Sequence, residues 1–225
     1  MKNKQMPYFN FICLFLFMLL SSCSVTRDLK QKSAYTDTEI KQLRKCNTAK
    51  LSWYMVPNSK RIILLTNLIR VNPTLFKKYL HLQTDSGYID KKYLNRKIEK
   101  RIAAKIPSKT KPIKPSFNLA LAAKLHSIVS GLTGQTGHQK LALRMRITLN
   151  TNLCYGENCY YGNDDAYGAV VAWIESDGHY HNLLDPGYYR IGVSGFWHSR
   201  YKKNYVQVFS GKKWMDLCLR DCVVN

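Results

Sequence analysis

The order of the apolar segments constrains the fold of this chain more than any other feature. Segments with helical apolar spacing come first, and two segments with alternating apolar residues come last. The helical segments span about 62–70, 74–81, 116–130 and 165–176, and the alternating ones span 190–197 and 204–210. A polar, basic stretch separates the last two segments, as in a β-hairpin. Helices followed by a short strand pair predict an α+β domain, with helices packed on a small antiparallel sheet.

The helix expected over 116–130 carries the clearest periodicity. Leu121, Leu125, Ile128 and Val129 fall at i, i+4, i+7 and i+8, so they form one apolar stripe. The pattern predicts that this stripe faces the core. His126 lies beside it and is expected to be a structural histidine.

The N-terminus has the pattern of a bacterial lipoprotein signal. Lys2 and Lys4 precede an apolar run over 9–20, and Leu20-Ser21-Ser22-Cys23 follows. The run is shorter than the roughly 20 residues that span a bilayer, which favours a removed signal over a permanent membrane helix. We therefore predict cleavage after residue 22, lipidation of Cys23, and a lipid-anchored place in the bacterial cell envelope, at the outer membrane.

Composition divides the rest of the chain. Residues 23–58 begin with a polar, charged stretch that predicts a tether, 59–211 are expected to form the domain, and 212–225 a tail. A basic, proline-containing insertion is expected at about 88–115. The formal net charge of +21 favours anionic partners such as lipid, polysaccharide or an envelope protein. Nucleic acid is not favoured, because no aromatic interleaving or known nucleic-acid module accompanies the charge.

Five cysteines follow Cys23, and an exported protein can hold disulfides. The candidates for pairing are Cys154, Cys159, Cys218 and Cys222. Their spacing leaves the pairing open, and the odd count leaves at least one thiol free in a monomer.

Several short motifs follow one another between residues 62 and 209. They are Asn67-Leu68-Ile69-Arg70, Leu121-Ala122-Ala123 through His126-Ser127, Gly137-His138, Gly156-Glu157-Asn158, Trp173-Ile174-Glu175-Ser176-Asp177-Gly178-His179 with Asn182, Ile191-Gly192-Val193, and Tyr205-Val206-Gln207-Val208-Phe209. In this order they resemble the CAP superfamily of cysteine-rich secretory, antigen 5 and pathogenesis-related proteins, and most of all its bacterial branch. The W-x-x-S-x-G-H pattern is the most specific of them. The resemblance implies an α-β-α sandwich.

The resemblance also implies a groove lined by His138, Glu157 and His179. Two neutral imidazoles can bind zinc or a similar divalent cation, so His138 and His179 are the candidate metal ligands. A nearby carboxylate can bind, orient or act as a base. Glu175 is a weaker candidate, since the position where many eukaryotic members have a glutamate is Ser176 here. Glu175 precedes it and points about 100° away on a helix.

Three functions follow from this reading. The first is a binding module for a lipid, cell-wall or protein ligand, with or without a metal. The second is a metal-dependent, protease-like hydrolase in which Glu157 acts as the base. The third is a structural envelope protein with a vestigial groove. Two histidines are fewer than the three protein ligands usual at a catalytic zinc, and the residues show no serine or cysteine nucleophile arrangement, so binding is favoured over catalysis.

Overall fold

The computed structural model describes residues 34–87, 90–104, 110–149 and 154–211. The signal segment with Cys23, and Cys218 and Cys222 of the tail, therefore lie outside the described residues. The elements are α3 (Asp37–Cys46), α4 (Pro57–Val71), α5 (Pro73–Asp85), the 3-10 helix η2 (Lys91–Tyr93), α6 (Arg96–Ala104), β1 (Lys114–Pro115), α7 (Phe117–Thr133), α8 (Leu141–Leu149), β2 (Cys154–Gly162), α9 (Ala166–Glu175), α10 (Asp177–Leu184), β3 (Tyr188–His198) and β4 (Lys202–Gly211).

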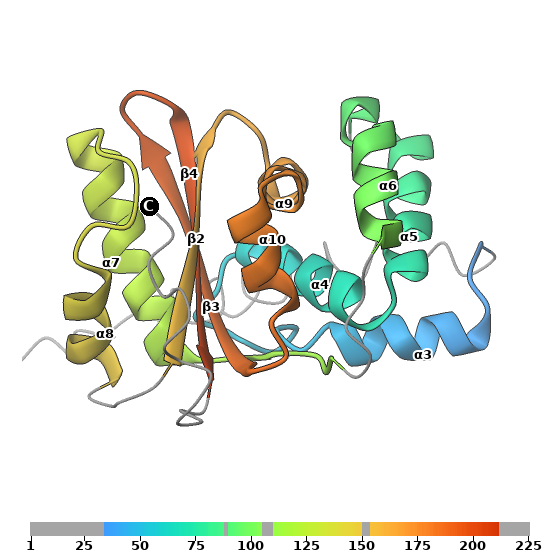
Figure 1. Cartoon of the computed structure of the whole chain (residues 1–225), viewed down its shortest axis with the longest axis horizontal. Helices are drawn as coiled ribbons and strands as arrows, with labels where there is room; N and C mark the ends of the chain where they lie inside the picture. The colour runs from blue at the N-terminus through green and yellow to red at the C-terminus, as the bar shows by residue number, and fades with distance from the viewer. Residues whose placement is uncertain (1–33, 88–89, 105–109, 150–153, 212–225) are drawn as a thin grey trace, which may run out of the picture.

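The strands form one sheet in the order β1-β3-β4-β2. The long strands pair antiparallel, whereas the two residues of β1 pair parallel to β3. Helices α7 and α8 cover one face of the sheet, and α4, α9 and α10 cover the other (Figure 1). The α+β class and the α-β-α layering are confirmed, and the short β1 makes the sheet mixed rather than purely antiparallel.

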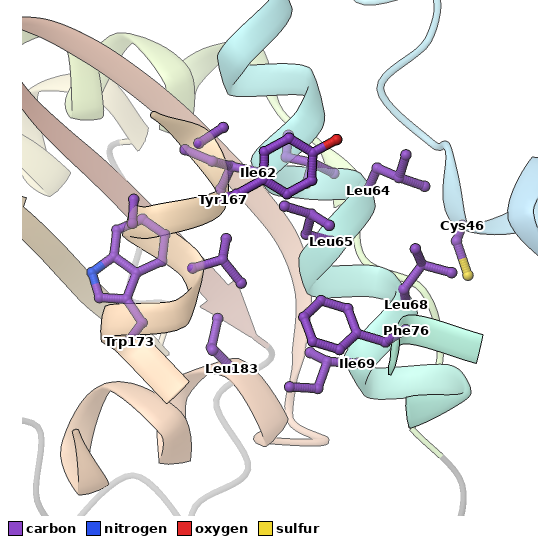
Figure 2. Packing of buried hydrophobic residues seen from close by; sticks show 14 of the residues in the cluster. Cys46, Ile62, Leu64, Leu65, Leu68, Ile69, Phe76, Tyr167, Trp173 and Leu183 are labelled. Atoms are coloured by element: carbon purple, nitrogen blue, oxygen red, sulfur yellow. The ribbon is translucent and has the colours of Figure 1, made fainter. Parts of the chain in front are cut away.

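The main core lies between the sheet and the layer of α4, α9 and α10. Side chains from α4, including Ile62, Leu65 and Ile69, are fully buried and lie near Tyr167 and Leu183 (Figure 2). Helix α4 ends where it does because Pro73 follows Asn72, and the Asn72 side chain then caps α5 by accepting from the Leu75 amide at 2.9 Å. The expected helices over 62–70 and 74–81 are thus confirmed and extended.

The expected tether is wrong over its described part. Thr36 and Glu39 form a capping box that starts α3, and Leu43, Cys46 and Ala49 are buried in the main core. Asn67 of α4 ties this segment down, because its side-chain amide donates to the Cys46 carbonyl at 2.9 Å. Three buried side chains and a capped helix offset the entropic cost of ordering this segment, although its overall composition is polar.

The expected basic insertion is partly packed. Its first half does form a basic helix, α6, whose Ile98 and Ile102 are buried against the main core. Residues 105–109 lie outside the described residues, and Lys114-Pro115 form β1 on the edge of the sheet. Within the described residues, no helix is long and apolar enough to cross a membrane.

The prediction about the apolar stripe of α7 is wrong. Leu121, Leu125 and Val129 are exposed, and the helix instead buries the opposite face of Leu119 and small or polar residues such as Ala122, Ala123 and Ser127. The reason is a close approach to β3: a Cβ on Gly192 would lie 2.1 Å from the Ala120 nitrogen. At such a distance few large side chains fit between helix and sheet.

Candidate functional site

The site is built around β2, which carries the G-E-N motif. Glu157 and Cys159 point toward the α7–α8 layer, and Asn158 between them points toward α10, as successive residues of a strand do. Because β2 is an edge strand of the sheet, its side chains can meet residues from both helical layers. The motif lies on a nine-residue strand.

Glu157 is the centre of a buried charge cluster. Arg144 of α8 donates to both carboxylate oxygens, with Nη1–Oε2 at 2.6 Å and Nη2–Oε1 at 3.0 Å. His138 Nδ1 lies 3.0 Å from Oε1, and the Glu157 side chain is completely buried. Burial alone would raise the pKa of this carboxyl, but the hydrogen bonds from His138 and Arg144 and the guanidinium charge lower the pKa to about 2. Glu157 is therefore ionised at neutral pH.

His138 and His179 come together as the resemblance implies. Their ring centroids lie 6.5 Å apart, with His138 about one-third exposed and His179 partly buried. An ionised carboxylate can only accept a hydrogen bond, so Nδ1 of His138 donates to Glu157, and a neutral ring then has its lone pair on Nε2. Burial, together with the nearby His138, lowers the pKa of His179. Both rings are then suited to bind a cation.

The turn before His138 is held by two side chains. His126 Nε2 lies 2.8 Å from the Gly137 carbonyl oxygen, and the Tyr161 hydroxyl donates to the same oxygen at 3.1 Å. Gly137 has a φ of +94°, a conformation that favours glycine. His126 is thus a structural histidine, as expected, but its role is to position the turn that carries His138.

His179 is positioned from the other layer by Asn158. The Asn158 side-chain amide donates to the His179 carbonyl at 3.1 Å, and Asn182 donates to Asn158 Oδ1 at 2.9 Å and to the Glu157 carbonyl at 3.3 Å. Trp173 Nε1 donates to the Cys159 carbonyl at 3.1 Å. The G-E-N motif and the W-x-x-S-x-G-H-x-x-N motif are therefore bonded to each other along the edge of β2.

His126, Glu157 and Cys159 also lie close enough to suggest a second metal group, with ligand atoms within 4.8 Å of one another. Their chemistry argues against it. Arg144 occupies both carboxylate oxygens of Glu157, and His126 Nε2 faces a carbonyl oxygen, which requires a proton on that nitrogen. Burial raises the pKa of Cys159 well above its usual range, so it stays a neutral thiol.

Two candidate residues do not behave as expected. Cys159 is a free, buried thiol, so its expected role in a disulfide is wrong. A disulfide among Cys154, Cys218 and Cys222 stays a prediction, because the last two lie outside the described residues. The Glu175 carboxylate accepts a hydrogen bond from the Asn95 side chain at 3.2 Å, next to the start of α6. This contact joins Glu175 to the α6 region and not to the histidine pair.

Sequence reasoning missed Arg144, the strongest partner of Glu157. It lies on α8, which no pattern in the sequence predicted. His198 is completely buried, with its Nδ1 accepting from the Arg200 and Tyr201 amides.

Comparison with known proteins agrees with this arrangement. Residues 106–209 match the model of the CAP family, described as the cysteine-rich secretory protein family. The part of the chain that carries the site is thus similar to the CAP family, over slightly less than half of the whole length. The matched range holds His138, Glu157, His179 and Arg144. Helices α3 to α6 precede this range in the chain and pack on the same core. No curated protein matches the sequence.

Three solved structures of bacterial proteins are similar to the chain. An extracellular protein containing a SCP domain from Bacillus anthracis is 20% identical with a TM-score of 0.46, over 72% of this chain and 43% of that one. An outer surface protein from Borrelia burgdorferi is 18% identical with a TM-score of 0.42, over 56% and 97%. A cysteine-rich secretory protein from Staphylococcus aureus is 17% identical with a TM-score of 0.42, over 68% and 38%. The chain spans less than half the length of the first and third of these proteins.

Proposed function

We propose that this CAP domain is an exported binding module whose groove holds a divalent cation, such as zinc, between His138 and His179. The observation that carries the proposal is the 3.0 Å contact between His138 Nδ1 and Glu157. A carboxylate behind a histidine orients the ring and raises the basicity of the nitrogen that faces a metal. Because a zinc–nitrogen bond is about 2 Å long, rings with centroids 6.5 Å apart can share an ion after a small side-chain rotation.

The same geometry supports binding over hydrolysis. A bound cation supplies Lewis acidity and open coordination positions for a ligand's oxygen atoms. Glu157 would be the base of a hydrolase, but it accepts hydrogen bonds from Arg144 and His138 on a fully buried side chain, and its pKa is about 2. A general base works best with a pKa near the operating pH. Glu157 therefore serves to position His138, and the ligand is a lipid, a cell-wall fragment or an envelope protein.

Zinc titration by calorimetry at pH 7.5 tests the metal proposal. We expect the chain from Ser24 onward, which contains the whole described core, to bind one zinc ion, and His138→Ala/His179→Ala to lose that binding. His81→Ala/His181→Ala removes two exposed histidines other than the proposed ligands and is the matched control, expected to bind as the unchanged chain does. Equal binding by all three proteins would show that the groove is not a metal site.

The lipid anchor is the second part of the proposal, and it rests on the sequence around Cys23. We propose that the mature protein is tethered to the outer membrane by this residue. Cys23→Ala is expected to abolish incorporation of a labelled fatty acid and to move the protein out of the membrane fraction. Cys13→Ala, within the apolar run, should leave both unchanged. Labelling that persists in Cys23→Ala would refute the anchor.

A further inference from the structure

The outer surface of the α7–α8 layer is apolar. Its members come from both helices, and they are Leu121, Leu125, Val129, Leu132, Leu143 and Ile147, which together form the α7–α8 apolar face. Val129, Leu132 and Ile147 expose 55%, 64% and 66% of their surface. The α7 members recur every three or four residues, so they lie along one side of the helix. An aliphatic surface spread over two helices is typical of a binding surface.

The charge around this face has one sign. Between Glu99 and Glu157 the sequence holds no Asp or Glu, so neither α7 nor α8 carries an acid. Lys124, Lys140 and Arg146 are exposed on these helices or on the connection between them. The layer thus presents aliphatic side chains together with cations, and no anion on either helix offsets them.

We propose that the α7–α8 apolar face docks on the surface of an anionic lipid bilayer. Helices that lie in a membrane interface bury aliphatic side chains at the boundary of headgroups and acyl chains, and Lys and Arg contact the anionic headgroups. The exposed side chains of Val129 and Ile147 would enter the acyl boundary, and those of Lys124 and Arg146 would contact the headgroups. This layer lies on the outside of the sandwich, across the sheet from α9 and α10, so docking leaves the other helical layer uncovered (Figure 1).

The charge argues for lipid over a second copy of this chain. In a two-fold dimer the same patch meets itself, so Lys124 and Arg146 would face a second set of the same cations. An anionic bilayer neutralises these charges, and each Lys or Arg near such a surface contributes about 1 kcal/mol of attraction. A polysaccharide offers no acyl region for Val129 and Ile147 to enter.

The docking surface is independent of the metal proposal and of Cys23. A single weak membrane contact gives reversible binding, and two contacts on one molecule give stable attachment. If Cys23 is acylated, the anchor holds the domain near the bilayer and raises the effective concentration of this face there. The face then orients the domain on the membrane.

Vesicle flotation tests the proposal with the chain from Ser24 onward, which has no lipid. We expect binding to vesicles of phosphatidylcholine mixed with phosphatidylglycerol, and much weaker binding to phosphatidylcholine alone. Val129→Asp/Ile147→Asp should weaken binding to the mixed vesicles by about tenfold or more, since each change removes an aliphatic contact and adds a repelled charge. Lys124→Gln/Arg146→Gln should weaken it by about tenfold, a loss that rising salt makes smaller because salt screens the same charges in the unchanged chain.

The control is Lys41→Gln/Lys45→Gln, which removes two exposed lysines from α3 on the opposite layer. It should bind as the unchanged chain does. If Lys41→Gln/Lys45→Gln loses as much vesicle binding as Lys124→Gln/Arg146→Gln, the attraction comes from net charge alone. The proposal of the α7–α8 apolar face as the docking surface would then be wrong. Thermal unfolding checks that each variant folds. Light scattering measures dimer formation and so tests the alternative occupant, a second copy of this chain. A concentration-dependent dimer that Val129→Asp/Ile147→Asp abolishes, with no vesicle binding, would overturn the proposal in favour of a second copy.

Discussion

Replacing Arg144 with methionine is expected to lower the free energy of unfolding by about 3–5 kcal/mol, because it leaves a buried carboxylate without its charge partner. Arg144 donates to both oxygens of Glu157, whose side chain is completely buried. Chemical denaturation measures the loss. Arg146→Met, two residues along the same helix and exposed, should cost less than about 0.5 kcal/mol.

The double variant Arg144→Met/Glu157→Gln separates the charge from the packing. With both charges gone, most of the stability should return, since replacing a buried ion pair by neutral groups is often close to neutral. A single variant that loses less than about 1 kcal/mol, or a double variant that loses as much as the sum of both single changes, would contradict this account of Glu157.

The loss should also depend on pH. In the unchanged protein the pKa of Glu157 is lowered to about 2, so its contribution to stability is present above about 4.5 and is lost as the pH falls toward 2. In Arg144→Met the effect of burial dominates and raises the pKa of Glu157. The carboxyl is then protonated and tolerated in the core at low pH, whereas its ionised form destabilises the fold at higher pH. The stability gap between the two proteins should therefore narrow as the pH falls from 7 to 4. A gap that widens over this range would show that the guanidinium charge is not what keeps Glu157 ionised.

Replacing Gly192 with alanine is expected to destabilise the domain by about 3 kcal/mol or more, the upper end of overpacking effects. The new Cβ would lie 2.1 Å from the Ala120 nitrogen and from the Leu119 carbonyl carbon, and both are backbone atoms that cannot rotate away. Helix α7 would have to move off β3, and with it the Gly137 turn that carries His138. A fall in the unfolding midpoint, accompanied by weaker zinc binding, is the expected measurement.

Gly87→Ala is the control for Gly192→Ala. No atom lies within 4 Å of the added Cβ at Gly87, and its φ of +74° limits the cost to about 1–2 kcal/mol of backbone strain. Equal losses in the two variants would mean that the contact between α7 and β3 is looser than the structure indicates.

Much of the site could be predicted from the sequence because the motifs carry it. His138, Glu157 and His179 are far apart in the chain, and the resemblance brought them together correctly. Arg144 could not be predicted, because no motif marks it and α8 has only weak amphipathic spacing. The periodicity of α7 marks its apolar stripe, but the prediction that this stripe faces the core was wrong. It could not tell which face lies inside, since that depends on Gly192, more than sixty residues later, allowing the helix to approach the sheet.

The prediction of a tether was wrong for a different reason. Overall polarity suggested a segment that cannot fold, whereas the few residues that matter, Thr36, Glu39 and Leu43, form a cap and a core contact. Local signals of this kind outweigh average composition when a neighbouring helix supplies the buried surface.

The bonds along β2 have a further consequence for how the molecule avoids sticking to itself. A strand at the edge of a sheet offers unpaired carbonyls to any passing chain. Asn182 and Trp173 donate to the carbonyls of Glu157 and Cys159, two residues apart and therefore on the same side of the strand. Side chains of the family motif thus occupy the places where an intruding strand would bond. Growth of the described sheet into fibrils or swapped dimers is therefore hindered along β2.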